Sequence, residues 1–203
     1  LYHGTHIAGT IAAVGDNAQG VTGLCWKLRI ISVKVADAFG LVYTDDAVDG
    51  IDYAVKHYAD IINISWGGDQ DSQALYDALE NAKNKGVLVV AGAGNDSVNN
   101  DSTPVYPASY DLDNIISVMA TDKDDNKEDS TNYGETTVDI GSPGDEILST
   151  MPTYETFLME VLGLPADYDF MSGTSISAGF VSGTAALLWS EKRDFSYNQV
   201  KDS

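Results

Sequence analysis

The sequence has too few cysteines for a disulfide framework and no apolar run long enough for a membrane helix. Cys25 is the single cysteine among 203 residues, so no disulfide can form within the chain. We interpret it as a small buried residue rather than a reactive thiol. The apolar runs are far shorter than the roughly 20 residues of a transmembrane helix, so no membrane segment is expected in this chain.

Positive charge is also scarce, because 11 Lys and Arg residues face 31 Asp and Glu residues and the formal net charge is −20. A polyanion repels nucleic acids and anionic membrane surfaces, so we expect neither as a partner. Cations and basic peptides are favoured instead. With 43% hydrophobic residues, the chain can build one domain with a sizeable core but hardly two.

The order of the apolar segments predicts an α/β fold. Helices are expected at 44–58 and 72–86, and strands at 28–35, 61–65, 87–91, 115–120, 138–140 and 146–149. The continuous apolar run at 87–91 is typical of a strand that is buried on both faces of a parallel sheet. A mainly parallel sheet flanked by helices follows, and such sheets bind ligands beyond the carboxyl ends of their strands.

A turn of small residues, Met-Ser-Gly-Thr-Ser at 171–175, runs directly into the apolar period of a helix. Ser175 stands at the join. Helix N-termini carry unpaired N–H groups, so a hydroxyl there can attack a carbonyl whose developing negative charge meets the hydroxyl's own N–H. Taken alone, Thr174 or Ser175 would more often be an ordinary helix cap.

Two other motifs favour a nucleophile over a simple helix cap at Ser175. His-Gly-Thr-His at 3–6 precedes apolar residues at helical spacing, which places His3 in the first turn of a helix. Asn95 follows Gly94 at the end of the strand at 87–91. Singly, a histidine is more often a satisfied polar residue than a base, and Gly-Asn is only a turn signal. Together with Ser175 they supply a base, an oxyanion donor and a nucleophile.

In these motifs the chain resembles the subtilisin-like serine peptidases (subtilases), from His3 to about Val200. The resemblance implies a three-layer subtilisin-like fold and a serine endopeptidase that forms an acyl-enzyme. Ser175 would attack, His3 would act as general base, and Asn95 with the Ser175 N–H would hold the oxyanion. By the same resemblance, His6 would be structural and the protein would be extracellular or on the cell surface.

Two segments match the family's substrate-binding edges. Asn-Ile-Ser-Trp-Gly-Gly at 63–68 matches the edge that pairs with the substrate backbone and borders the primary specificity pocket, and 39–42 aligns with the opposite edge. Val42 replaces a usual glycine, which would narrow the outer subsites. Trp66 stands where smaller aliphatic residues are common, and the alternative is an ordinary core aromatic. The implied substrate-binding residues are Gly40, Leu41, Val42, Ser65, Trp66, Gly67 and Gly94.

The turn-forming loop at 14–21 offers oxygen atoms of the kind that Ca²⁺ prefers. Similar loops in the family bind a structural calcium ion through carbonyls that match Val14, Gln19 and Val21 and a side chain that matches Asn17. The family's remaining calcium ligands precede the position of His3. Catalysis itself would need no cofactor.

Two further departures from the family pattern stand out. Gly179 and Phe180 replace the usual Pro and His after the nucleophile. The segment 156–169 is longer than is usual. We expect one or two helical turns there, which pack an apolar face on the domain and restrict binding on the leaving-group side of the site. The alternative is a surface insertion without a role. The Tyr-Pro-Ala turn at 106–108, by contrast, matches a family turn whose peptide bond is cis.

In subtilases the orienting Asp precedes the catalytic His, yet only Leu1 and Tyr2 precede His3. We therefore interpret 1–203 as a partial catalytic domain, truncated at both ends, and expect it to be inactive by itself. No signal peptide is visible, which is uninformative in a chain that begins so close to a motif. A polypeptide substrate and a pro-segment are the expected partners. The alternative is a catalytically inactive subtilase-like binding or assembly module. A nucleotide-binding domain is disfavoured because no Gly-x-Gly-x-x-Gly follows the first strand.

Overall fold

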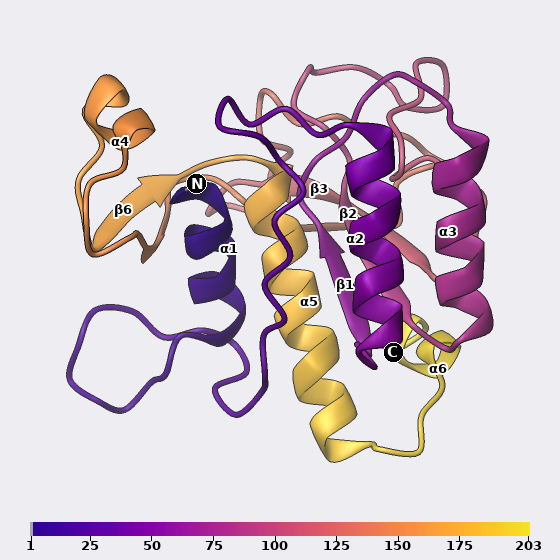
Figure 1. Ribbon diagram of the computed structural model, residues 1–203, viewed down its shortest axis with the longest axis horizontal. Coiled ribbons are helices and arrows are strands. Elements are labelled where there is room, and N and C mark those ends of the chain that lie inside the picture. The colour runs from indigo at the N-terminus through magenta and orange to yellow at the C-terminus, as the bar shows by residue number, and fades with distance from the viewer. Residues whose placement is uncertain (1) are drawn as a thin grey trace.

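The computed structural model describes residues 2–203 and shows three layers, with a sheet between two groups of helices (Figure 1). The sheet has four parallel strands in the order β1-β2-β3-β4. The strands are β1 (Ile61–Ile64), β2 (Leu88–Gly92), β3 (Ile115–Thr121) and β4 (Ile140–Pro143). Every residue of β2 is buried, as its continuous apolar run predicts.

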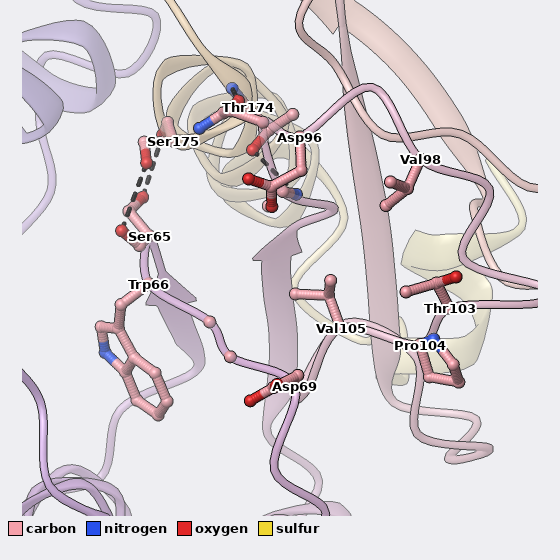
Figure 2. Close-up of a pocket in the computed structure, with 15 residues that line it drawn as sticks. Ser65, Trp66, Asp69, Asp96, Val98, Thr103, Pro104, Val105, Thr174 and Ser175 are labelled. Carbon is pink, nitrogen blue, oxygen red and sulfur yellow. Dashed lines mark hydrogen bonds between the residues drawn. The ribbon is translucent and has the colours of Figure 1, made fainter.

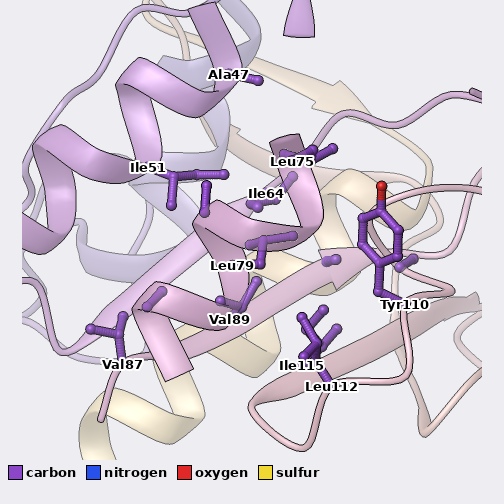
Figure 3. Close-up of a cluster of buried hydrophobic side chains, with 14 residues drawn as sticks. Ala47, Ile51, Ile64, Leu75, Leu79, Val87, Val89, Tyr110, Leu112 and Ile115 are labelled. Atoms are coloured by element: carbon purple, nitrogen blue, oxygen red, sulfur yellow. The ribbon is translucent and has the colours of Figure 1, made fainter. Parts of the chain in front are cut away.

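Helices α2 (Thr44–Lys56) and α3 (Gln73–Asn84) cover one face of the sheet (Figures 1 and 3). Ile51 from α2 and Leu79 from α3 pack with Val89 of β2, because alternate strand residues point to the same face. The Ser72 hydroxyl caps α3 by accepting the Leu75 N–H. This cluster forms the larger part of the core.

Helices α5 (Thr174–Glu191) and α6 (Tyr197–Lys201) cover the opposite face. Ala178 and Ala185 of α5 pack with Leu88 and Val90, the β2 residues that point away from α2 and α3. Helix α1 (Tyr2–Ala12) lies against the outer side of α5 (Figure 1). No helix among residues 2–203 is both long enough and apolar enough to cross a membrane. The buried Cys25 is a free thiol, as expected.

A second sheet pairs β5 (Ile147–Thr150) with β6 (Tyr168–Met171) in antiparallel register, and α4 (Phe157–Leu162) connects them. We call residues 147–171 the hairpin lobe. It extends from the domain at the left of Figure 1, beside α1. The Thr150 hydroxyl donates to the Thr5 carbonyl at 2.9 Å, and the Ser149 hydroxyl donates to the His6 carbonyl at 2.8 Å. The lobe is therefore docked on the helix that carries His3.

Two sequence predictions fail and one is confirmed. Segment 28–35 forms no strand, and Ile30 and Ile31 are 47% and 39% exposed, because no strand within residues 2–203 pairs with it. Helix α4 forms as predicted, yet Phe157 is 78% exposed, so its apolar face is not packed on the domain; Met159 is the buried residue instead. The Tyr106–Pro107 peptide bond is cis, as predicted.

Candidate active site

Ser175 lies in the first turn of α5, two residues after a glycine with a positive φ. Gly173 has φ 129°, and a Cβ there would lie 3.2 Å from Asn95 Oδ1, so both backbone conformation and space favour glycine. The Ser175 hydroxyl donates to the Ser65 carbonyl at 3.2 Å, and the Ser65 hydroxyl donates to the Ser175 carbonyl at 2.9 Å (Figure 2). The turn thus holds the half-buried hydroxyl at the carboxyl end of β1.

Two unpaired N–H donors accompany this hydroxyl. The Thr174 N–H donates to Asn95 Oδ1 at 2.9 Å, which leaves the Asn95 Nδ2 group as the free end of the amide. Neither this group nor the Ser175 N–H has an acceptor within residues 2–203. The Gly94 N–H also donates to Thr174 Oγ1 at 3.2 Å, so the two segments are joined twice. Free donors beside a nucleophile are what a developing oxyanion requires.

The packing of α1 on α5 brings His3 to the level of Ser175. A Cβ at Gly179 would lie 3.4 Å from Ile7, and Gly183 lies against the next turn of α1. The two helices therefore run in the same direction. His3 lies one helical turn before Ile7, as Ser175 lies one turn before Gly179. The structure thus places the base and nucleophile predicted from sequence at matching ends of two packed helices.

The surroundings of His3 keep its imidazole neutral. Burial of the ring, and to a smaller extent the neighbouring His6, lower the pKa of His3 below its ordinary value. A general base must be neutral to accept a proton. Among residues 2–203, no carboxylate pairs with His3 and no hydrogen bond joins it to Ser175.

His6 has a different environment from that of His3. It is fully buried, and its Nε2 lies 3.0 Å from the Ile147 carbonyl and 3.2 Å from the Asp169 carbonyl. The ring therefore joins α1 to both sides of the hairpin lobe. These contacts are those of a structural residue.

A cavity of about 530 Å³ opens beside Ser175 (Figure 2). It brings Ser65, Trp66, Gly67 and Gly94 together with the nucleophile. Trp66 also packs against the core cluster under α2 and α3. The full lining consists of Ser65, Trp66, Gly67, Gly68, Asp69, Gly92, Gly94, Asn95, Asp96, Val98, Thr103, Pro104, Val105, Thr174 and Ser175.

Some of these wall residues were not expected from the sequence. The cavity wall at 103–105 precedes the Tyr-Pro-Ala turn, and no local pattern marks it as part of a site. Thr174 was considered only as a helix cap, whereas its hydroxyl accepts the Gly94 N–H. The small-residue turn at 171–175 was the only sequence signal that could have indicated a role for Thr174 in the site.

Gly40, Leu41 and Val42 lie outside this cavity. They form a turn in which the Asp37 carboxylate accepts the Leu41 N–H at 3.0 Å, and Leu41 is 57% exposed. Val42 instead packs against the core cluster. The structure therefore does not bring this segment into contact with Ser175.

The loop at 14–21 keeps its oxygen atoms accessible. The carbonyls of Val14, Gln19 and Val21 accept no hydrogen bond from residues 2–203, and Asn17 Oδ1 accepts one, from the Gln19 N–H at 3.0 Å. No cluster of three or more His, Cys, Asp or Glu side chains suited to a metal occurs among those residues. The donor set of the loop, carbonyls with one amide, fits Ca²⁺ rather than a softer metal.

Comparison with known proteins agrees with this arrangement. The model of the subtilase family (Peptidase_S8) matches residues 1–203. The chain is 41% identical to a thermophilic serine proteinase from Bacillus sp. (strain AK1), covering 95% of this chain and 43% of that protein. It is 39% identical to thermitase from Thermoactinomyces vulgaris, covering 96% of this chain and 63% of that protein. The chain thus spans only part of the length of these relatives.

Solved structures show the same likeness in three dimensions. A protease from Pseudoalteromonas arctica superimposes with a TM-score of 0.87 at 30% identity, over 98% of this chain and 62% of that chain. A cold-adapted subtilisin-like serine proteinase gives a TM-score of 0.81 at 28% identity, over 99% of this chain and 66% of that chain. The α/β fold with its parallel sheet is therefore that of the subtilisin-like proteases, and the chain belongs to the subtilase family.

Proposed function

We propose that the protein is a serine endopeptidase that hydrolyses polypeptides through an acyl-enzyme on Ser175. One observation carries the proposal: the Asn95 Nδ2 group and the Ser175 N–H are both unpaired beside the Ser175 hydroxyl. Donors that have no protein acceptor and stand beside a hydroxyl suit a negative charge that appears only during reaction.

The chemical steps follow from the side chains present. The Ser175 oxygen attacks the peptide carbonyl while its hydroxyl proton, which in the resting structure points to the Ser65 carbonyl, is transferred to the imidazole of His3. The carbonyl oxygen becomes negatively charged and accepts hydrogen bonds from Asn95 and the Ser175 N–H. His3 then gives its proton to the leaving amine. Water attacks the acyl-enzyme by the same route and regenerates the hydroxyl.

The cavity beside Ser175 would hold the side chain that precedes the scissile bond. Its wall combines apolar surface from Trp66 and Val105 with the carboxylates of Asp69 and Asp96. The substrate backbone would run extended between the edges at 65–67 and 40–42 and make main-chain hydrogen bonds. Extended polypeptide segments are accordingly the proposed substrate class.

A carboxylate that orients the His3 imidazole is part of the same proposal. No carboxylate within residues 2–203 pairs with His3, so the orienting Asp would be supplied from outside them. In subtilisin the loss of that Asp costs about 3 × 10⁴ in kcat, so the 203-residue chain alone is expected to be nearly inactive. The family relationship further supports an extracellular or cell-surface location and a pro-segment as a partner.

We also propose a structural calcium ion at the loop 14–21, held by the carbonyls of Val14, Gln19 and Val21 and by Asn17. The free carbonyls support it, as does the net charge of −20. The loop packs on the hairpin lobe, since a Cβ at Gly20 would lie 2.1 Å from the Tyr168 ring. Chelation should therefore lower the melting temperature, and Asn17→Ala should reduce the difference; equal melting curves with and without chelator would contradict the site.

Covalent labelling of the full-length protein with a fluorophosphonate tests the proposed activity. Ser175→Ala and His3→Ala should each abolish labelling, because a serine hydroxyl is a poor nucleophile without its base. Ser172→Ala, which removes a neighbouring exposed hydroxyl, is the matched control and should be labelled normally. Label that persists on Ser175→Ala would move the nucleophile elsewhere. A full-length protein that takes no label at all would favour an inactive binding or assembly module.

A further inference from the structure

The proposed oxyanion donor lies on a stretch without regular secondary structure. Strand β2 ends at Gly92, and residues 93–98 belong to no helix or strand. Asn95 itself is exposed, so packing does not hold its side chain. Apart from the bond between its Oδ1 and the Thr174 N–H, its position depends on the backbone on either side. Something other than secondary structure must therefore hold segment 93–98.

One residue, Asn132, makes four hydrogen bonds to the backbone of that segment, more than any other residue. Its N–H donates to the Gly94 carbonyl at 2.8 Å. Its Oδ1 accepts the Asp96 N–H at 2.8 Å and the Val98 N–H at 3.2 Å. Its Nδ2 donates to the Ala93 carbonyl at 3.1 Å. Asn132 thus binds the backbone on both sides of the oxyanion donor.

Asn132 is itself anchored in the sheet. It is fully buried, and its Nδ2 also donates to Asn100 Oδ1 at 3.1 Å. The preceding Thr131 accepts the Ala120 N–H of β3 at 2.9 Å and donates to the Asn132 carbonyl at 3.1 Å. A Cβ at Gly94 would lie 2.4 Å from Asn132 Nδ2, which shows how closely the two segments approach.

We propose that Asn132 is the positioning residue of the oxyanion site, which it fixes by holding segment 93–98 in place. This inference rests on the proposed function. The amide uses two acceptor and two donor positions at once, which no other side chain of that length provides. A catalytic donor works only when it is placed accurately, and a misplacement of about 1 Å can cost about a hundredfold in rate.

The kinetic test compares Asn132→Ala and the milder Asn132→Ser with the full-length wild type. We expect kcat to fall by about tenfold to a hundredfold with KM nearly unchanged, because the oxyanion forms only in the transition state. In an Asn95→Ala background the same substitutions should cost less than about twofold further, since the donor that they position is already gone. Equal losses in both backgrounds would show a merely structural role and overturn the proposal.

Asn114 offers a matched control at the opposite end of the sheet. It is also fully buried, and its Nδ2 donates to the Val87 carbonyl at 3.0 Å, just before β2 and β3 begin. Asn114→Ala should lower stability without changing kcat. A fall in kcat in Asn114→Ala equal to that in Asn132→Ala would overturn the proposal. An unchanged kcat in a folded Asn132→Ser protein would overturn it as well.

Hydrogen exchange supplies a measurement that does not require activity. Amides of 93–98 should exchange at least about tenfold faster in Asn132→Ser than in the wild type, and at the wild-type rate in Asn114→Ala. Unchanged exchange would refute the hold on this segment. A wild type that neither takes the label nor turns over substrate would instead refute the proposed function, while the exchange result would still decide whether Asn132 holds the segment.

Discussion

Segment 93–98 and the hairpin lobe both border the proposed catalytic residues, yet they are held in opposite ways. The segment has no regular structure, and four of its backbone groups form hydrogen bonds with the buried Asn132. The lobe pairs its own backbone between β5 and β6 and leaves large apolar side chains exposed. Phe157 is 78% exposed, Val161 63% and Phe170 60%.

The difference shows which region depends on specific side chains and which can accept changes in its outer side chains. A backbone that leaves regular structure needs specific partners for its N–H and C=O groups, so segment 93–98 depends on single side chains. The lobe satisfies its backbone internally, so its outer side chains are free to contact another molecule. One region should therefore control catalytic rate and the other substrate preference.

The largest expected effect comes from substitution of Gly94, and Gly163 of the lobe provides the comparison. Gly94 has φ 111° and no room for a Cβ, whereas Gly163 of the lobe has φ 67° and open space around it. Gly94→Ala should displace segment 93–98 and lower kcat by about a hundredfold or more. Gly163→Ala should cost only about 1–2 kcal/mol of stability and leave kcat for a small chromogenic substrate unchanged. Similar kinetics for the two variants would remove the contrast.

A smaller effect is expected when the lobe is shortened. Replacing 156–169 with a short Gly-Ser turn in the full-length protein should alter cleavage of peptides extended past the scissile bond by about tenfold or somewhat more, since one buried apolar side chain is worth at least about 1.5 kcal/mol. Small chromogenic substrates should be turned over as before. Phe157→Ser with Val161→Ser is the finer version. Identical cleavage profiles would make the lobe a surface insertion without this role.

The smallest effect concerns Asp101, which follows segment 93–98 in the chain and accepts hydrogen bonds from the loop at 135–137. The hydroxyls of Thr137 and Thr136 donate to its carboxylate, and together with the Glu135 and Thr136 N–H groups they lower its pKa from 3.8 to about 2. A lowered pKa means that the carboxylate stabilises the fold above pH 3.8 and that this contribution disappears as the pH falls through about 2. Melting temperatures of wild type and Asp101→Asn should therefore differ slightly at neutral pH and converge in that interval. A constant difference would contradict this.

Most of the proposed catalytic positions could be identified from the sequence because each lies in a short local pattern. Ser175 follows a small-residue turn into a helix, and Asn95 follows a buried strand. The family resemblance connects them with His3. The structure adds that α1 and α5 run side by side in the same direction, which the sequence could not show because helix packing depends on residues distant in the chain.

The failed predictions share a cause. The segment 28–35 has the β-branched composition of a strand but no partner within residues 2–203, so it stays irregular. The apolar spacing in α4 indicates a helix correctly, but spacing alone does not say which surface covers its apolar face. In both cases a local preference, for strand or for helix, was taken to imply a packing partner that the preference itself does not supply.

The sequence by itself determined the alternation of strands and helices, the turn that presents Ser175 and the glycines of the tight turns, because these follow from local periodicity and backbone conformation. Tertiary structure alone decided the hydrogen bonds of Asn132, on which its proposed positioning role rests, because no local pattern in the sequence marks this residue. The four residues that bond to its side chain lie more than thirty positions away in the chain, within residues 93–100. A side chain's hydrogen bonds are set by which segments the fold brings together, and that is a property of the whole chain.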